Sequence, residues 1–193
     1  MHYFQSRLHE TWAVFLGSSH EDWLRYPSSD CFETFPFPKN WETNPNLEAI
    51  GKQYYEFRAE LMVRTNQGLT DTYNRFHDPN ELDPDILTLR QLHAECDRAV
   101  LDAYGWADVA IDCEFRLDYE DEDLEGSSKR KKPWRYRRPE DVHDEVLAWL
   151  LKLNQDRAQA ETLGAKQRRS SVNNGKANKR RTFAAETPTI PGL

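Results

Sequence analysis

The sequence predicts a mainly α fold: a helical domain with one or two short strands, followed by a disordered basic tail. Two amphipathic segments of helical period, residues 45–67 and 84–105, are separated by a short linker. Residues 109–119 alternate apolar and polar side chains, as a strand does. Residues 162–193 are polar, basic and without periodicity. We therefore expect three parts, with boundaries after residues 43 and 161.

The charge is distributed unevenly along the 193 residues. Residues 1–127 hold 10 Lys/Arg and 26 Asp/Glu, whereas residues 128–193 hold 16 and 7. A basic arm on an acidic body is a plausible phosphate binder. The alternative is a solvated arm that folds against the acidic segment 118–125.

Simple patterns argue against a membrane protein, a secreted protein, a disulfide framework and a zinc site. No apolar run approaches the roughly 20 residues that span a membrane, and residues 1–16 lack the features of a secretory signal, so we expect a cytoplasmic protein. Cys31, Cys96 and Cys113 are odd in number, far apart and without a Cys-x-x-Cys pair. We expect reduced buried thiols rather than a disulfide framework or a zinc site.

The first 46 residues predict one helix and an irregular segment. Residues 2–16 have helical spacing but no cap before them, as a piece cut from a longer polypeptide would show. After Gly17, residues 20–46 are expected to be irregular. Pro36 and Pro38 exclude a helix there and leave at most one short edge strand.

The two central helices have recognisable ends. Asn44 caps the first, Pro45 suits its first turn, and Gly68 closes it. The second runs from Pro84 to Gly105. Two such helices joined by a short linker are expected to pack against each other.

The later elements are a strand, a loop and a helix. The strand over residues 109–119 needs a partner, either residues 30–37 or a sheet elsewhere in a larger chain. Residues 118–132 are predicted to be a mobile loop. Pro139 opens a last helix, with Glu140 and Asp141 at its positive end.

Catalytic motifs are absent from the sequence. No two glycines are separated by a single residue, no Asp or Asn precedes a Pro-Pro pair, and there is no Gly-x-Ser-x-Gly. His93 and Cys96 have a spacing that could ligate a metal, but two ligands without partners are better explained by core packing. We predict no catalytic residue and no metal site.

Two segments favour nucleic-acid binding. Residues 129–138 interleave seven cations with Trp134 and Tyr136, and cations meet phosphates while flat rings stack. The phosphate-binding candidates are Arg130, Lys131, Lys132, Arg135 and Arg137. The alternative is an aromatic pair that docks a basic linker onto the helical body.

The second segment is the loop around residues 23–30, whose short polar side chains could reach base edges if a rigid scaffold holds them. Its candidates are Arg25, Tyr26 and Ser29. Arg25 could instead pair with a local acid.

Short motifs in order carry a resemblance to a known family. They are His9-x-x-Trp12, Gly17, Arg25-Tyr26, Ser29 and Phe32-x-x-Phe-Pro-Phe-Pro38, and then the segments Gly68–Pro79, Ile86–His93, Asp97–Trp106 and Lys132-Pro-Trp-Arg-Tyr136. Their order resembles the C-terminal part of single-chain type IIG and IIL restriction–modification enzymes, which carry an adenine-N6 methylase. The resemblance covers about residues 5–160.

The resemblance implies the end of a target-recognition domain, residues 1–43, followed by a helical C-terminal domain, residues 44–161. The methylase and endonuclease domains are missing, so S-adenosylmethionine would bind the missing methylase domain and no cofactor is expected in this chain. The implied function is DNA recognition and scaffolding in an adenine-specific DNA methyltransferase or restriction–modification enzyme. The implied partners are double-stranded DNA and a methyltransferase subunit or domain.

A hypothesis from another class is a helical protein-interaction subunit. It would dock a methyltransferase through the apolar face of residues 2–16 without contacting DNA. In the linker, the resemblance favours a structural role, with Tyr73 and Phe76 packed on the helices and His77 and Asp78 fixing the turn. Direct contact of these side chains with DNA is the alternative.

Overall fold

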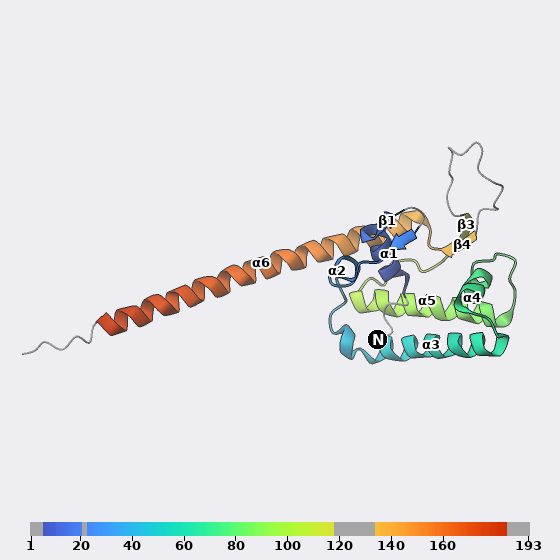
Figure 1. Cartoon of the computed structure of the whole chain (residues 1–193), viewed down its shortest axis with the longest axis horizontal. Coiled ribbons are helices and arrows are strands. Elements are labelled where there is room, and N and C mark those ends of the chain that lie inside the picture. Colours follow the sequence, from blue (N-terminus) through green and yellow to red (C-terminus); the bar gives the residue numbers. More distant parts are fainter. Residues whose placement is uncertain (1–5, 21–22, 118–133, 185–193) are drawn as a thin grey trace, which may run out of the picture. The chain divides into compact units, whose positions relative to one another are not determined.

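The computed structural model describes residues 6–20, 23–117 and 134–184 (Figure 1). The chain divides into two compact units, residues 1–150 and 151–193. Within the first unit, residues before 43 share one apolar core with the central helices. The expected fold class is confirmed: the chain is mainly helical with short strands.

The helical elements make up most of the described chain. They are α1 (Arg7–Leu16), α2 (Ser28–Cys31), the 3-10 turn η2 (Trp41–Thr43), α3 (Pro45–Thr65), α4 (Leu69–Phe76), α5 (Pro84–Tyr104) and α6 (Glu140–Ala184). The strands are β1 (Ser18–His20), β2 (Trp23–Arg25), β3 (Glu114–Leu117) and β4 (Trp134–Arg137). They form two separate antiparallel pairs, β1–β2 and β3–β4.

The caps of the two long central helices follow the sequence, except at one end. Asn44 Oδ1 accepts the backbone N–H groups of Asn46 and Leu47 at 3.0 and 3.3 Å, and Gly105 ends α5 with φ +79°. The C-cap of α3 is Asn66, with φ +51°, rather than Gly68. Asparagine tolerates the left-handed conformation, and Gly68 then serves as the N-cap of α4.

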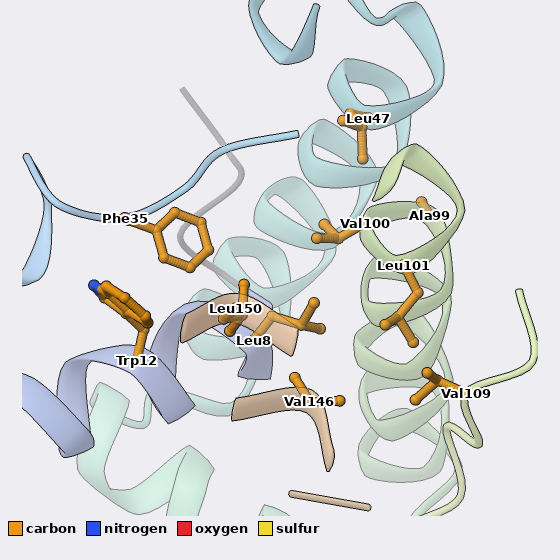
Figure 2. Packing of buried hydrophobic residues seen from close by; sticks show 10 residues of the cluster. All are labelled: Leu8, Trp12, Phe35, Leu47, Ala99, Val100, Leu101, Val109, Val146 and Leu150. Carbon is orange, nitrogen blue, oxygen red and sulfur yellow. The ribbon is translucent and has the colours of Figure 1, made fainter. Parts of the chain in front are cut away.

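Two apolar clusters lie along α5, which packs against α3. The first cluster contains Tyr54 and Leu61 of α3, Phe76 of α4, and the N-terminal half of α5. The second joins α1, the loop at Phe35, the C-terminal half of α5 and the start of α6. Figure 2 shows this second cluster, with Leu8 beside Leu150 and Val146, and Trp12 facing Phe35.

The linker between α3 and α5 is fixed by Arg90 of α5, a side chain that is 8% exposed. Its guanidinium donates to the carbonyls of Phe76 at 3.0 Å and Asp78 at 2.8 Å, and to those of Arg75 and Glu81 at 3.3 Å. These carbonyls lie at the C-terminal end of α4 and in the turn after it, where helix carbonyls lose their regular partners. Those of Arg75 and Asp78 also accept the backbone N–H groups of Asp78 and Glu81 at 3.1 and 3.2 Å.

The linker's aromatic side chains pack on the body. Phe76 is 1% exposed, and the hydroxyl groups of Tyr73 and Tyr54 are hydrogen-bonded. His77 Nδ1 accepts the backbone N–H of Tyr136 at 3.0 Å, which ties the linker to β4. These contacts therefore show the structural role that the sequence predicted, in which Tyr73 and Phe76 pack on the helices.

The partner of β3 differs from the predicted one. β3 pairs with β4 in a hairpin-like ribbon rather than with residues 30–37. Residues 28–31 form α2 instead, and Phe35 and Phe37 stack edge to face at 4.8 Å. The expected irregular region 20–46 also contains β2, which pairs with β1. The predicted mobile loop, residues 118–132, lies outside the described residues.

The prediction of disorder from residue 162 differs from the structure, in which α6 continues to Ala184. The sequence of this stretch contains Ala, Lys and Arg and has no proline before Pro188. These residues favour helix even without an apolar stripe. Residues 185–193 lie outside the described residues.

Replacing Arg90 with Met tests its role in fixing the linker. Met keeps part of the apolar stem but removes the guanidinium donors from four carbonyls, of which those of Phe76 and Glu81 depend on Arg90 most, so we expect a loss of about 3 kcal/mol in the free energy of unfolding. Urea unfolding measures it. Arg64→Met is the control, because the exposed Arg64–Asp85 ion pair should contribute under about 1 kcal/mol. Equal losses in the two variants would contradict the role of Arg90.

Candidate nucleic-acid interface

The β3–β4 ribbon carries arginines on one face and aromatic rings on the other. Arg116 lies directly opposite Arg135, Glu114 opposite Arg137, and Phe115 opposite Tyr136. Because side chains alternate between the faces of a strand, the three arginines share one face. The chemistry of the ribbon therefore differs sharply between its two sides.

The aromatic face holds the ribbon on the body. The rings of Phe115 and Tyr136 lie 4.8 Å apart. The Arg90 guanidinium lies 5.0 and 5.5 Å from their centroids, and that of Arg7 lies 5.5 Å from Tyr136. Tyr136 is thus placed between two cations and is half-buried. It docks the ribbon, as the alternative interpretation of this segment proposed, whereas Trp134 remains 41% exposed.

The outer face brings two like charges opposite each other. Like charges directly opposite on paired strands are destabilising, and here Arg116 faces Arg135. Glu114 and Glu140 lie 3.5 and 3.4 Å from Arg116 and partly offset the repulsion. An anion bound across this face would offset it further. Of the phosphate-binding candidates, Arg135 and Arg137 are on this face, whereas Arg130, Lys131 and Lys132 lie outside the described residues.

The other candidates, Arg25, Tyr26 and Ser29, lie together at the end of β2 and the start of α2. All three are exposed. Tyr26 is held by α1, because its hydroxyl is 2.8 Å from Nε2 of His9. Ser29 Oγ donates to Asp30 Oδ1 at 3.0 Å. These groups form a small polar surface anchored on a buried histidine.

The two sets of candidates contact different sides of α1. His9 contacts Tyr26, whereas the adjacent Glu10 lines a pocket together with Arg116 and Arg137. The structure thus brings Arg137 to Arg116, a residue that the sequence did not single out. It does not join Arg25 to the ribbon directly.

A pocket of about 310 Å³ opens beside the ribbon. It is lined by α1, β3, the end of β4 and the first turns of α6. Behind it lies Asp97 of α5, which is 0% exposed. Asp97 Oδ1 accepts the backbone N–H of Arg7 at 2.8 Å, and Oδ2 lies 3.1 Å from Arg7 Nη1 and 2.9 Å from Arg138 Nη2.

Sequence reasoning missed the buried trio Arg7, Asp97 and Arg138, although one signal was present. Asp97 occupies the apolar stripe of α5, four residues after His93 and three before Val100. A carboxylate in a buried stripe requires a cationic partner. Arg138 was counted among seven similar cations, and its burial depends on alternation along β4.

The structure gives no sign of metal or thiol chemistry in the parts of the chain that it describes. Within residues 6–20, 23–117 and 134–184, no group of three His, Cys, Asp or Glu could hold a metal ion. The three cysteines are free, and loss of solvation raises the pKa of each thiol. His93 stacks edge to face on Tyr54 at 5.2 Å. No helix of the described part of the chain could cross a membrane.

Comparison with known proteins adds no relative. No protein-family model, no curated protein and no solved structure matches the chain. The site is therefore interpreted from its own chemistry.

The buried histidines predict a stability that depends on pH. Burial lowers the pKa of both His9 and His93 to about 4, below the unfolded value of about 6.5. Between these values the unfolded chain binds more protons, so the free energy of unfolding falls as the pH falls from 6.5 to 4. The loss should reach at most about 3 kcal/mol per histidine.

Urea unfolding at a series of pH values measures this slope. His9→Gln and His93→Gln should each remove part of it, because glutamine does not titrate in this range. A slope that is as steep in both variants as in the parent chain would show that neither histidine is responsible.

Proposed function

We propose that the chain is a DNA-recognition and scaffold segment of a site-specific adenine DNA methyltransferase or restriction–modification enzyme, without the catalytic domain, that acts in the cytoplasm. The observation that carries the DNA-binding part is the arginine face of the β3–β4 ribbon. The family is proposed from the motifs quoted above. S-adenosylmethionine would bind the methylase domain that this chain lacks.

The arginine face suits a phosphate backbone. Arg116, Arg135 and Arg137 project from one side of a two-stranded ribbon whose other side is anchored by aromatic packing. Arginine binds phosphate oxygens with two parallel N–H donors, and neighbouring phosphates would relieve the Arg116–Arg135 repulsion. Such contacts position a protein on DNA rather than specify sequence.

The second surface suits contacts to base edges. Arg25, Tyr26 and Ser29 are exposed on a hairpin end and a short helix, and the His9–Tyr26 hydrogen bond fixes one of them to α1. Short polar side chains and arginine are the groups that read the major groove. We propose that this surface contributes to recognition and the ribbon to affinity.

The alternative, an interaction subunit that docks through the apolar face of residues 2–16, is less well supported. Leu8 and Trp12 of that face are 0% and 2% exposed because they pack within the chain's own core, whereas Phe4 lies outside the described residues. Val14 and Phe15 remain about half exposed, which is a small area for a stable interface.

Duplex binding as a function of salt tests the proposal. Each neutralised phosphate contributes about 0.9 to the slope of log K against log salt, so we expect binding that weakens steeply with KCl. Replacing Arg116, Arg135 and Arg137 with Gln should reduce the slope by about 2 to 3. Fluorescence anisotropy with a labelled duplex measures both effects.

Arg64→Gln is the matched control, since Arg64 is an exposed arginine on α3, outside both proposed surfaces. It should leave the slope unchanged. Affinity that is independent of salt, or a triple variant that binds as the parent does, would refute the DNA-binding part. Recovery of a methyltransferase with the chain, in the absence of duplex binding, would favour the interaction subunit.

A further inference from the structure

We infer that the pocket between α1, the β3–β4 ribbon and the start of α6 binds one phosphate group through the buried side chains of Arg7 and Arg138. This inference does not rest on the proposed DNA binding. It rests on charge, hydrogen bonding and space around the trio of Arg7, Asp97 and Arg138.

The buried charges of the trio do not balance. The side chains of Arg7 and Arg138 are 8% and 4% exposed, and that of Asp97 is 0% exposed. Two guanidinium groups therefore share one carboxylate away from solvent. A buried charge without a counter-charge costs several kcal/mol, and an arginine cannot shed its proton to avoid that cost. The arrangement is one negative charge short.

The guanidinium groups also retain unused donors. Among the described residues, Arg7 Nη2 and Arg138 Nε have no hydrogen-bond acceptor. Arg138 Nη2 lies 2.9 Å from Asp97 Oδ2 but is not aligned for a hydrogen bond. Buried donors without acceptors are rare in folded proteins. Both arginines line the pocket, so an oxyanion there could accept from both.

The pocket has room for such a ligand. Its volume of about 310 Å³ is several times the roughly 30 Å³ that a water molecule occupies in the liquid. A tetrahedral oxyanion presents oxygens in several directions, which fits donors that converge from two guanidinium groups on different segments. Arg116 and Arg137 line the same pocket and add positive charge at its rim.

The acidic side chains of the lining supply the missing charge only in part. Glu140 is paired with Arg116 at 3.4 Å, and Asp144 with His143 at 3.3 Å. Glu10 forms no ion pair with any residue that the structure describes. Loss of solvation raises the pKa of Glu10, although part of the residue is exposed, and the nearby Arg7 and Arg138 oppose this shift only in part. Glu10 therefore competes with a bound phosphate for the same two arginines.

Titration with inorganic phosphate tests the inference. The parent chain should show a saturable rise in melting temperature and heat of binding with phosphate, and neither with chloride at the same ionic strength. Glu10→Gln removes a repelling charge from an exposed position and should raise the affinity for phosphate several-fold. Arg138→Lys loses the fork of donors and should lower it about tenfold or more. Arg64→Gln should behave as the parent, because Arg64 pairs with Asp85 and does not line the pocket.

Identical responses to phosphate and chloride in the parent and in Glu10→Gln would overturn the inference. So would an unchanged affinity in Glu10→Gln, a variant that does not depend on tolerance of a buried substitution. Competition with a labelled duplex then assigns the source of the phosphate. If phosphate displaces the duplex more than chloride does, the group belongs to the DNA backbone. If phosphate binds saturably but leaves the duplex in place, the site serves free phosphate. Either assignment applies only after the titration has shown saturable binding of phosphate.

Discussion

The carboxylate of Asp97 is the constraint on which the arrangement of the first unit depends. A fully buried charge on the middle of α5 is tolerable only if cations are brought to it, and they come from two distant segments. Arg7 begins α1, and Arg138 follows β4. Satisfying one side chain thus fixes the N-terminal helix, the end of the ribbon and the start of α6 around α5. The second apolar cluster joins α1, α5 and the start of α6 as well.

The segment from Trp134 to Arg138 shows how one strand divides similar residues between two roles. Alternation turns Tyr136 toward Arg7 and Arg90 and buries Arg138, whereas Arg135 and Arg137 face outward. A basic cluster that is uniform in composition is therefore not uniform in function. The outward arginines are suited to a polyanion on the surface, and the inward one is suited to a single anion held in a pocket.

Local signals in the sequence were sufficient for the helices but not for the site. Asn44, Pro45, Pro84 and Gly105 determine helix ends through chemistry that acts within a few residues, and the structure places those ends as expected. The pairing of β3 with β4 depends on residues about twenty positions apart, and the trio of Arg7, Asp97 and Arg138 on residues much further apart. Periodicity shows that Asp97 is in a buried stripe, but it does not show which cation meets it.

The trio has a consequence for the order in which the chain can fold. The α3–α5 pair and its linker are made of contacts between neighbours in sequence, and such contacts close quickly. The Arg7–Asp97 contact joins residues 90 positions apart, and the charge of Arg138 is added only after β4 has been synthesised. During synthesis, α1 must therefore remain without its final partners until residue 138 has been made. The α3–α5 pair can fold before α1 docks on it.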